Sequence, residues 1–189
     1  MRSLKFTIWL SFTGCALIAS ALSADERQIN ITGTYLNKDY GYFVHLKDGL
    51  SGSNLAPPAP QHGFGINLKP STAGYVWVMA YYDALMVGSV ERAAEQESHR
   101  FVEQDGLLVI EDKPATLSGL AAREVVLSDR AGKHAINYVR LLVVYRKVPG
   151  EVGIIYQIGL QQHTRSAEGE AVVSSIVDSF RMVPISGVP

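Results

Sequence analysis

Cysteine is almost absent from this chain of 189 residues, whose one cysteine is Cys15, inside an apolar stretch near the N-terminus. A disulfide within the chain is therefore excluded, and a hydrophobic core must hold the fold together. An excess of one charge is also lacking, since 17 basic residues stand against 18 acidic ones. Nucleic-acid binding needs a clustered basic face, so we expect no nucleic-acid partner.

Catalytic and metal-binding motifs are lacking too. No G-x-S-x-G motif is present, and the five histidines are scattered without H-x-x-x-H or H-E-x-x-H spacing. Gly63-Phe64-Gly65 lacks the third glycine and the following helix of a dinucleotide loop. Glu95, His99 and Glu103 share one face at helical spacing, which is more typical of a solvated face than of a metal site. We expect no enzyme activity, no cofactor and no metal.

The first 24 residues have the pattern of a secretory signal peptide. Arg2 and Lys5 precede an apolar or small run over residues 6–22, then small residues up to Ala24, and the chain turns polar at Asp25. We expect cleavage near Ala24 and a secreted or periplasmic bacterial protein. The mature chain keeps 15 of the 17 basic residues and all 18 acidic ones, a formal charge of −3.

Two alternatives for this segment stay open. Phe12-Thr13-Gly14-Cys15 resembles the lipobox of bacterial lipoproteins, which predicts lipidation of Cys15. The apolar run over residues 6–22 is also close to the lower length limit, about 17 residues, for a helix that spans a bilayer. A membrane association is expected only in these two cases.

The remaining chain is long enough for one domain. We predict a lead-in over 25–39, a single globular domain over 40–183 and a flexible tail over 184–189. Alternating or apolar runs predict strands, and the run "YVWVMAYY" is expected to be covered on both faces, whereas 152–161 is expected to be half-exposed. The predicted strands are 42–46, 64–68, 75–82, 107–110, 123–127, 135–148 and 152–161.

Two segments change to helical spacing. Residues 90–102 follow Ser89, a favourable N-cap, and residues 168–180 carry an apolar stripe. The expected class is therefore α+β, with a mainly antiparallel sheet of about six to seven strands and two packed helices in an α/β/α sandwich.

The segments "GYFVHL", "ATLSGLAAREVV", "VRLLVVYR…GIIYQIGL" and "VVSSIVDSFRMV" together resemble the PsbP-like α/β/α sandwich superfamily. The resemblance covers residues 40–183 and concerns topology. It implies a largely non-catalytic fold that photosystem accessory proteins and some periplasmic type VI immunity proteins share. No functional residue is carried over from it.

A proline-stiffened loop, Ser51 to Gln61, leads into the predicted strand "HGFGINL". Stiff loops lose little entropy on binding, and tyrosine and tryptophan anchor many interfaces. One interpretation is a recognition surface, bordered by His62, Phe64, Trp77, Tyr81 and Tyr82. The other is that the aromatic residues are core and that His62 only bonds the loop backbone, with Gly63 and Gly65 allowing close backbone approach.

These observations predict a secreted, non-catalytic envelope module that binds a protein or a small ligand. The resemblance adds an immunity- or inhibitor-type role. One alternative is an envelope hydrolase or metal-dependent enzyme that uses His62 with Asp83 or Glu111. The other is a scaffolding lipoprotein anchored through Cys15.

Overall fold

The computed structural model describes residues 30–54, 62–69, 74–129, 136–149 and 152–185. They form the following elements in chain order: β1 (Asn30–Ile31), β2 (Thr34–Asn37), β3 (Tyr42–His45), β4 (Gly52–Asn54), β5 (His62–Asn67), β6 (Gly74–Tyr82), α1 (Val90–Asp105), β7 (Leu108–Leu117), β8 (Leu120–Ser128), β9 (Tyr138–Arg146), β10 (Ile154–Gln162), α2 (Ala167–Ser179) and β11 (Arg181–Met182). The predicted signal peptide, with Cys15, lies outside the described residues.

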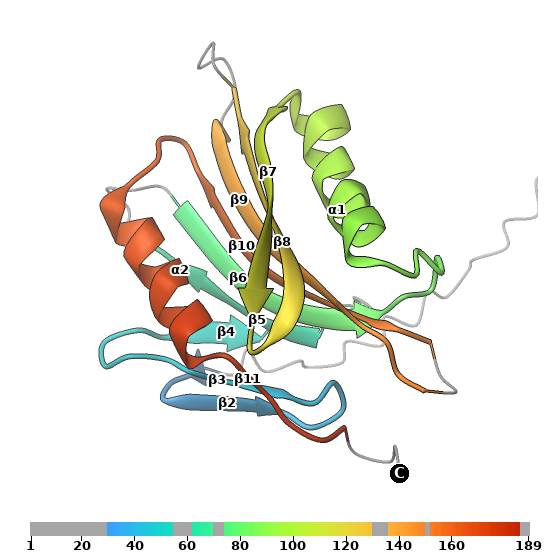
Figure 1. Ribbon diagram of the computed structural model, residues 1–189. Helices are drawn as coiled ribbons and strands as arrows, with labels where there is room; N and C mark the ends of the chain where they lie inside the picture. The colour runs from blue at the N-terminus through green and yellow to red at the C-terminus, as the bar shows by residue number, and fades with distance from the viewer. Residues whose placement is uncertain (1–29, 55–61, 70–73, 130–135, 150–151, 186–189) are drawn as a thin grey trace, which may run out of the picture.

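The molecule has three layers, with an antiparallel sheet in the middle (Figure 1). The eight strands of this sheet follow the order β1-β4-β5-β6-β10-β9-β8-β7. Helix α1 packs against β8 and β9 on one face of this sheet, and α2 packs against β10 and β6 on the other face and also contacts β3. A small sheet, β11-β3-β2, lies next to the C-terminal end of α2 (Figure 1). The α+β sandwich prediction is confirmed.

The predicted strand number, six to seven, was too low. The described residues contain eight strands in the large sheet and three in the small one. Four of them, β1, β2, β4 and β11, have two to four residues and are too short to show a period of two. Two of these short strands, β1 and β2, lie in the segment taken as a lead-in and pair with β4 and β3.

Each face of the large sheet has its own core. On the α2 side, the Tyr42 and Phe180 rings stack with centroids 5.3 Å apart, and Tyr156 meets Tyr42 edge-on at 5.9 Å. On the α1 side, Phe101 of the helix stacks on Trp77 of β6 at 6.3 Å. The alternation of β6 therefore divides its residues between two cores, as expected for a strand covered on both faces.

The half-exposed character predicted for 152–161 was wrong. Every residue of β10 except Gln161 is buried. The face rich in glycine is covered because rings from the neighbouring strands lie on it. A Cβ at Gly159 would lie 2.1 Å from the Trp77 ring, and one at Gly153 would lie 2.1 Å from the Tyr145 hydroxyl. Glycine here provides space for an aromatic ring, whereas the sequence pattern suggested a solvent-facing row.

Local signals positioned both helices as predicted. The Ser89 side chain accepts a hydrogen bond from the Arg92 amide at 3.3 Å and caps α1. Ser166 caps α2 in the same way, through the Gly169 amide at 3.1 Å.

The strands predicted at 107–110 and 123–127 were too short, because β7 and β8 continue toward each other and form a hairpin. It turns at Ser118 and Gly119, which both have positive φ angles, as a two-residue hairpin turn requires. The outer strand, β7, carries a register shift between Val109 and Glu111, and Pro114 follows in the same strand.

Candidate functional site

The five aromatic and histidine residues predicted to border one surface lie on two faces of the sheet. His62, Phe64 and Tyr82 point to the α2 side, whereas Trp77 and Tyr81 point to the α1 side. Phe64 and Trp77 are buried in the two cores, with exposed fractions of 0% and 4%. The structure therefore does not bring the five side chains together, although Tyr82 lies at the boundary between the faces.

His62 is exposed at the start of β5 and is held by aromatic contacts. Its ring stacks on Tyr40 with centroids 4.9 Å apart, and Tyr40 in turn contacts Tyr82 at 5.0 Å. The His62 carbonyl accepts a hydrogen bond from the Tyr42 hydroxyl at 2.9 Å. Burial, and then the neighbouring Tyr82, raises the pKa of Tyr40. This arrangement is a row of rings, and among the described residues the imidazole makes no hydrogen bond or ion pair with an acid or a base.

The acidic residues considered as partners of His62 are engaged elsewhere. Glu111 lies on β7, five strand spacings from β5, which is about 24 Å along the sheet. It pairs with Lys113 at 2.8 Å. Both carboxylate oxygens of Asp83 accept backbone hydrogen bonds in the loop that follows β6.

That loop, residues 83–89, is built around Asp83. The carboxylate is 2% exposed and accepts from the amides of Val87 at 2.9 Å and Gly88 at 3.1 Å. The Asp83 carbonyl accepts from the Met86 amide, and the Asp83 amide donates to the Gly153 carbonyl at 2.7 Å. Burial and the adjacent Asp83 carboxylate raise the pKa of Tyr145. The buried Asp83 thus fixes the loop through its carboxylate and ties it to the residue before β10 through its backbone amide.

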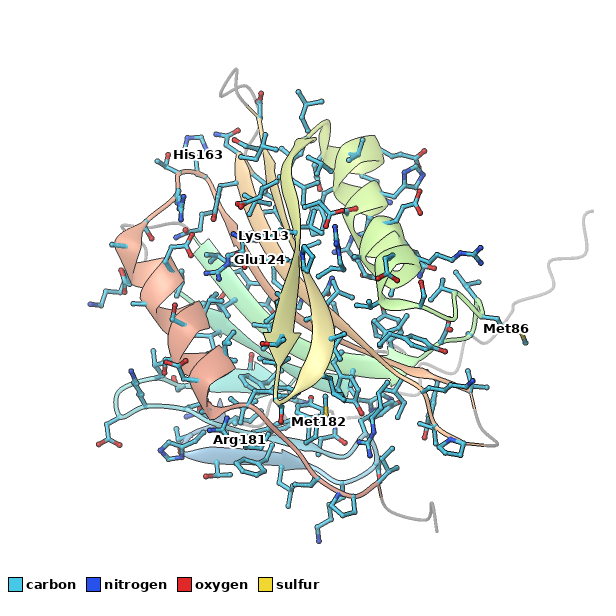
Figure 2. The ribbon with its side chains drawn as sticks, in the orientation of Figure 1. Met86, Lys113, Glu124, His163, Arg181 and Met182 are labelled. Carbon is cyan, nitrogen blue, oxygen red and sulfur yellow. The ribbon has the colours of Figure 1, made fainter. Side chains whose placement is uncertain are left out.

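The same loop presents apolar side chains to solvent. Leu85 and Met86 are 73% and 80% exposed, and Figure 2 shows Met86 projecting away from the body of the molecule. Met86 has a φ of 53°, a left-handed conformation that a residue with a side chain seldom adopts. Tyr82 and Val152 are also exposed and lie next to the loop, because β6 and β10 are paired there. We call Tyr82, Leu85, Met86 and Val152 the apolar end patch.

A cleft of about 290 Å³ lies between this loop and α1. Tyr81 and Glu97 on its wall belong to a hydrogen-bonded chain that begins behind the cleft at Trp77, whose indole donates to the buried Gln157 at 2.7 Å. Gln157 donates to Glu97 at 3.2 Å, and the Tyr81 hydroxyl donates to the other Glu97 oxygen. Burial, and then the Glu97 carboxylate, raises the pKa of Tyr81 well above its ordinary value. The cleft is lined by Tyr81, Tyr82, Asp83, Ala84, Leu85, Gln96, Glu97, Arg100 and Ile155.

Sequence reasoning found Tyr81 and Tyr82 but missed the loop. The sequence of this loop is "DALMVGS", in which Leu85 and Met86 stand between Asp83 and the glycine that precedes the helix cap. Short apolar pairs have no period, so only the structure shows that Leu85 and Met86 face solvent.

A second polar cluster joins α2 to the sheet. Arg140 of β9 donates to Glu124 at 2.9 Å and to Glu170 of α2 at 2.6 Å. The Tyr138 hydroxyl and Arg165 also donate to Glu170, at 2.6 and 2.9 Å. Every member of this cluster has a partner, so we interpret it as a structural link between layers.

Within the described ranges, no group of three or more His, Cys, Asp or Glu side chains is placed to hold a metal ion. The helical face considered above contributes one exposed pair, His99 and Glu103, at 3.0 Å. Among the same residues, no helix has the length and apolar character needed to cross a bilayer.

Comparison with known proteins supports the fold. No protein-family model matches the chain, and no curated protein matches it by sequence. The solution structure of cyanobacterial PsbP (CyanoP) from Synechocystis sp. PCC 6803 is similar, with a TM-score of 0.54 and 10% identity over 79% of this chain and 91% of that one. LpqN, involved in cell envelope biogenesis of Mycobacterium tuberculosis, has a TM-score of 0.51 and 13% identity over 85% of this chain and 94% of its own. The chain therefore has the PsbP-like α/β/α fold, as its sequence segments suggested.

Proposed function

We propose that this protein is a non-catalytic binding module of the bacterial cell envelope that recognises a protein partner through the apolar end patch. The observation that carries the proposal is the loop in which buried Asp83 fixes the backbone while Leu85 and Met86 stay in solvent. A strained, well-held loop with exposed apolar side chains is unfavourable for the free protein. Such features persist where binding uses them.

The energetics of the patch suit protein recognition. Covering a leucine or methionine side chain contributes about 1.5–3 kcal/mol, so the two loop residues alone supply a useful share of a binding free energy. The loop backbone is already ordered, and its ordering cost is therefore small on association. Tyr82 adds a large ring whose position is set by Tyr40, which suits an interface anchor.

The finer form of the proposal is an immunity- or inhibitor-type role, in which the partner is a secreted enzyme. It is supported by the resemblance to a fold that such proteins share. Co-expression with a toxin-like enzyme encoded beside its gene would test it. We expect protection from that enzyme, and growth inhibition despite co-expression would count against the role.

The alternatives have less support. For a hydrolase or metal-dependent enzyme using His62, the two acidic partners considered, Asp83 and Glu111, are engaged elsewhere. The lipoprotein alternative concerns Cys15, which lies outside the described residues. Mass spectrometry of the mature N-terminus decides it, since lipidation adds acyl mass to that cysteine.

Site-specific photo-crosslinking tests the proposed surface. A photoreactive phenylalanine analogue at Met86 is expected to capture one specific envelope protein in the native host. The matched control is the same analogue at Leu36 on β2, which is also apolar and 48% exposed. With the captured protein in hand, Leu85→Ser with Met86→Ser should weaken the purified complex at least tenfold, whereas Leu36→Ser should not. Equal binding by both variants would exclude the patch.

A further inference from the structure

The α1-side face of β5, β6 and β10 carries an unusual row of side chains at the end of the sheet opposite the apolar end patch. Asn67, Tyr75 and Gln161 stand directly opposite one another in the pairing register of the three strands. Directly opposed side chains on one face have Cβ atoms about 5 Å apart, so the tyrosine is flanked by an amide on each side. Helix α1 packs mainly against β8 and β9, and it reaches β6 through the contact of Phe101 with Trp77.

The Tyr75 ring is a fixed platform. It lies over Gly65, where a Cβ would be 1.8 Å from the tyrosine hydroxyl. It is also stacked with the Trp77 ring, with centroids 6.0 Å apart and an angle of 21° between the two planes. Trp77 is held in turn by Gly159 below it and by Gln157. Partial burial raises the pKa of Tyr75, which stays a neutral phenol.

These three residues line a cleft of about 240 Å³ together with Ile136, Gln162 and His163. Figure 2 places His163 at the far end of the molecule from Met86. Among the described residues that line the cleft, none is an aspartate, glutamate, lysine or arginine. The cleft therefore has no fixed charge to balance a phosphate, a carboxylate or a metal ion.

The three side-chain amides that line the cleft differ in whether they are already hydrogen-bonded within the protein. Gln162 is committed, because it donates to the Ser166 hydroxyl at 2.6 Å and accepts from the Ser166 amide at 3.1 Å. Asn67 and Gln161 make no side-chain hydrogen bond in the described part of the chain, and Asn67 is exposed. Each amide offers two donors and an acceptor, the combination that a hydroxyl group matches.

We propose that this cleft is a subsite for a neutral pyranose sugar. The apolar face of the sugar ring lies on Tyr75, and hydroxyl groups on opposite edges of the ring meet the Asn67 and Gln161 amides. The combination of one rigid aromatic face with flanking neutral amides favours a ring that is apolar on its face and polar around its edge. The lack of charge excludes nucleotides and acidic glycans as preferred ligands. This site is separate from the apolar end patch and does not depend on it.

An NMR titration of the purified protein tests the proposal, with tri-N-acetylchitotriose and maltotriose as neutral probes and tri-galacturonate as a charged one. We expect a neutral probe to give saturable shifts of the Asn67 and Gln161 side-chain amide signals, and tri-galacturonate to bind at least tenfold more weakly. Asn67→Ala with Gln161→Ala should lower the affinity about tenfold, from the loss of two hydrogen bonds. The matched control is Gln104→Ala, an exposed amide on α1, which should bind as the wild type does.

Three results would overturn the subsite: no saturable shift with either neutral probe, equal affinity for tri-galacturonate, or unchanged affinity in the double variant. Gln161→Glu provides a second variant that keeps the size of the side chain. It should weaken binding in the same direction even if the double variant does not fold, and unchanged binding by it would also contradict the proposal. Loss of partner capture at Met86 would leave this result unaffected, so the two proposals fail separately.

Discussion

The indole ring of Trp77 occupies the space that a side chain on Gly159 would fill, since a Cβ there would lie 2.1 Å from two of its ring atoms. The two residues are directly paired across β6 and β10. Their relationship explains why a glycine-rich face is buried, and it links the α1-side core to the proposed sugar cleft through Tyr75.

Gly159→Ala is expected to destabilise the protein by about 1–3 kcal/mol, because the added methyl group forces the Trp77 ring out of its position. Urea unfolding followed by circular dichroism measures the change. Trp77→Leu tests whether the indole ring is the cause, since a smaller side chain at position 77 should leave room for the alanine at position 159. In a double-mutant cycle the alanine should then cost clearly less. Equal costs in both backgrounds would show that the ring is not responsible.

Asp83→Ala is expected to destabilise the protein by about 1–3 kcal/mol, because the Val87 and Gly88 amides lose a charged acceptor. Hydrogen exchange at Val87 and Gly88 should become faster, while exchange in the middle of β9 should change only with global stability. Asp83→Asn retains one acceptor oxygen and should lie between the wild type and the alanine variant. Unchanged exchange at the two amides would contradict the role given to Asp83.

Met86→Gly is expected to change the free energy of unfolding by less than about 1 kcal/mol. Glycine removes the cost of the left-handed conformation at φ 53°, which offsets the greater freedom of the unfolded chain. Partner capture should nevertheless fall, because the exposed side chain is lost. Thermal unfolding and the crosslinking yield at Leu85 measure the two effects. A large loss of stability would mean that the Met86 side chain supports the fold.

Glu170→Gln is expected to reduce stability by about 1–3 kcal/mol at pH 7, since Arg140 loses a charged partner. Burial alone would raise the pKa of Glu170, but the hydrogen bond from Tyr138 and the charge of Arg140 lower it below 4.5. As the pH falls, Glu170 therefore takes up a proton in the unfolded state before it does so in the folded state. Its contribution to stability is present above about pH 4.5 and is lost as the pH falls further.

The stability difference between wild type and Glu170→Gln should thus be constant near neutral pH and shrink below pH 4.5. The matched control is Glu168→Gln on the same helix, whose 3.8 Å pair with Lys69 is exposed and should contribute little. A difference that persists to pH 2 would show that the carboxylate charge is not what stabilises α2 on the sheet.

Long periodic segments were predictable from sequence, and short ones were not. The Ser89 cap of α1, the apolar stripe of α2 and the alternation of β6 depend on local rules, so the positions of these elements were confirmed. The burial of β10 was missed because it depends on rings that come from β6 and β9. Gly63 follows the predicted close backbone approach, since a Cβ there would lie 1.9 Å from the Val78 carbonyl oxygen.

The candidate site was only partly predictable for the same reason. Aromatic residues on one strand alternate between two faces, and this divided the predicted group of His62, Phe64, Trp77, Tyr81 and Tyr82. The register that aligns Asn67, Tyr75 and Gln161 joins three segments far apart in the chain, and no spacing within one segment encodes it.

The position of Trp77 also gives the protein a built-in optical reporter. The chain has two tryptophans, and Trp9 lies in the predicted signal peptide, so its removal leaves Trp77 as the single indole chromophore. This indole is 4% exposed and hydrogen-bonded to a buried amide, and its emission should therefore shift to longer wavelength when the fold opens. Unfolding of the α1-side core can thus be followed without any label.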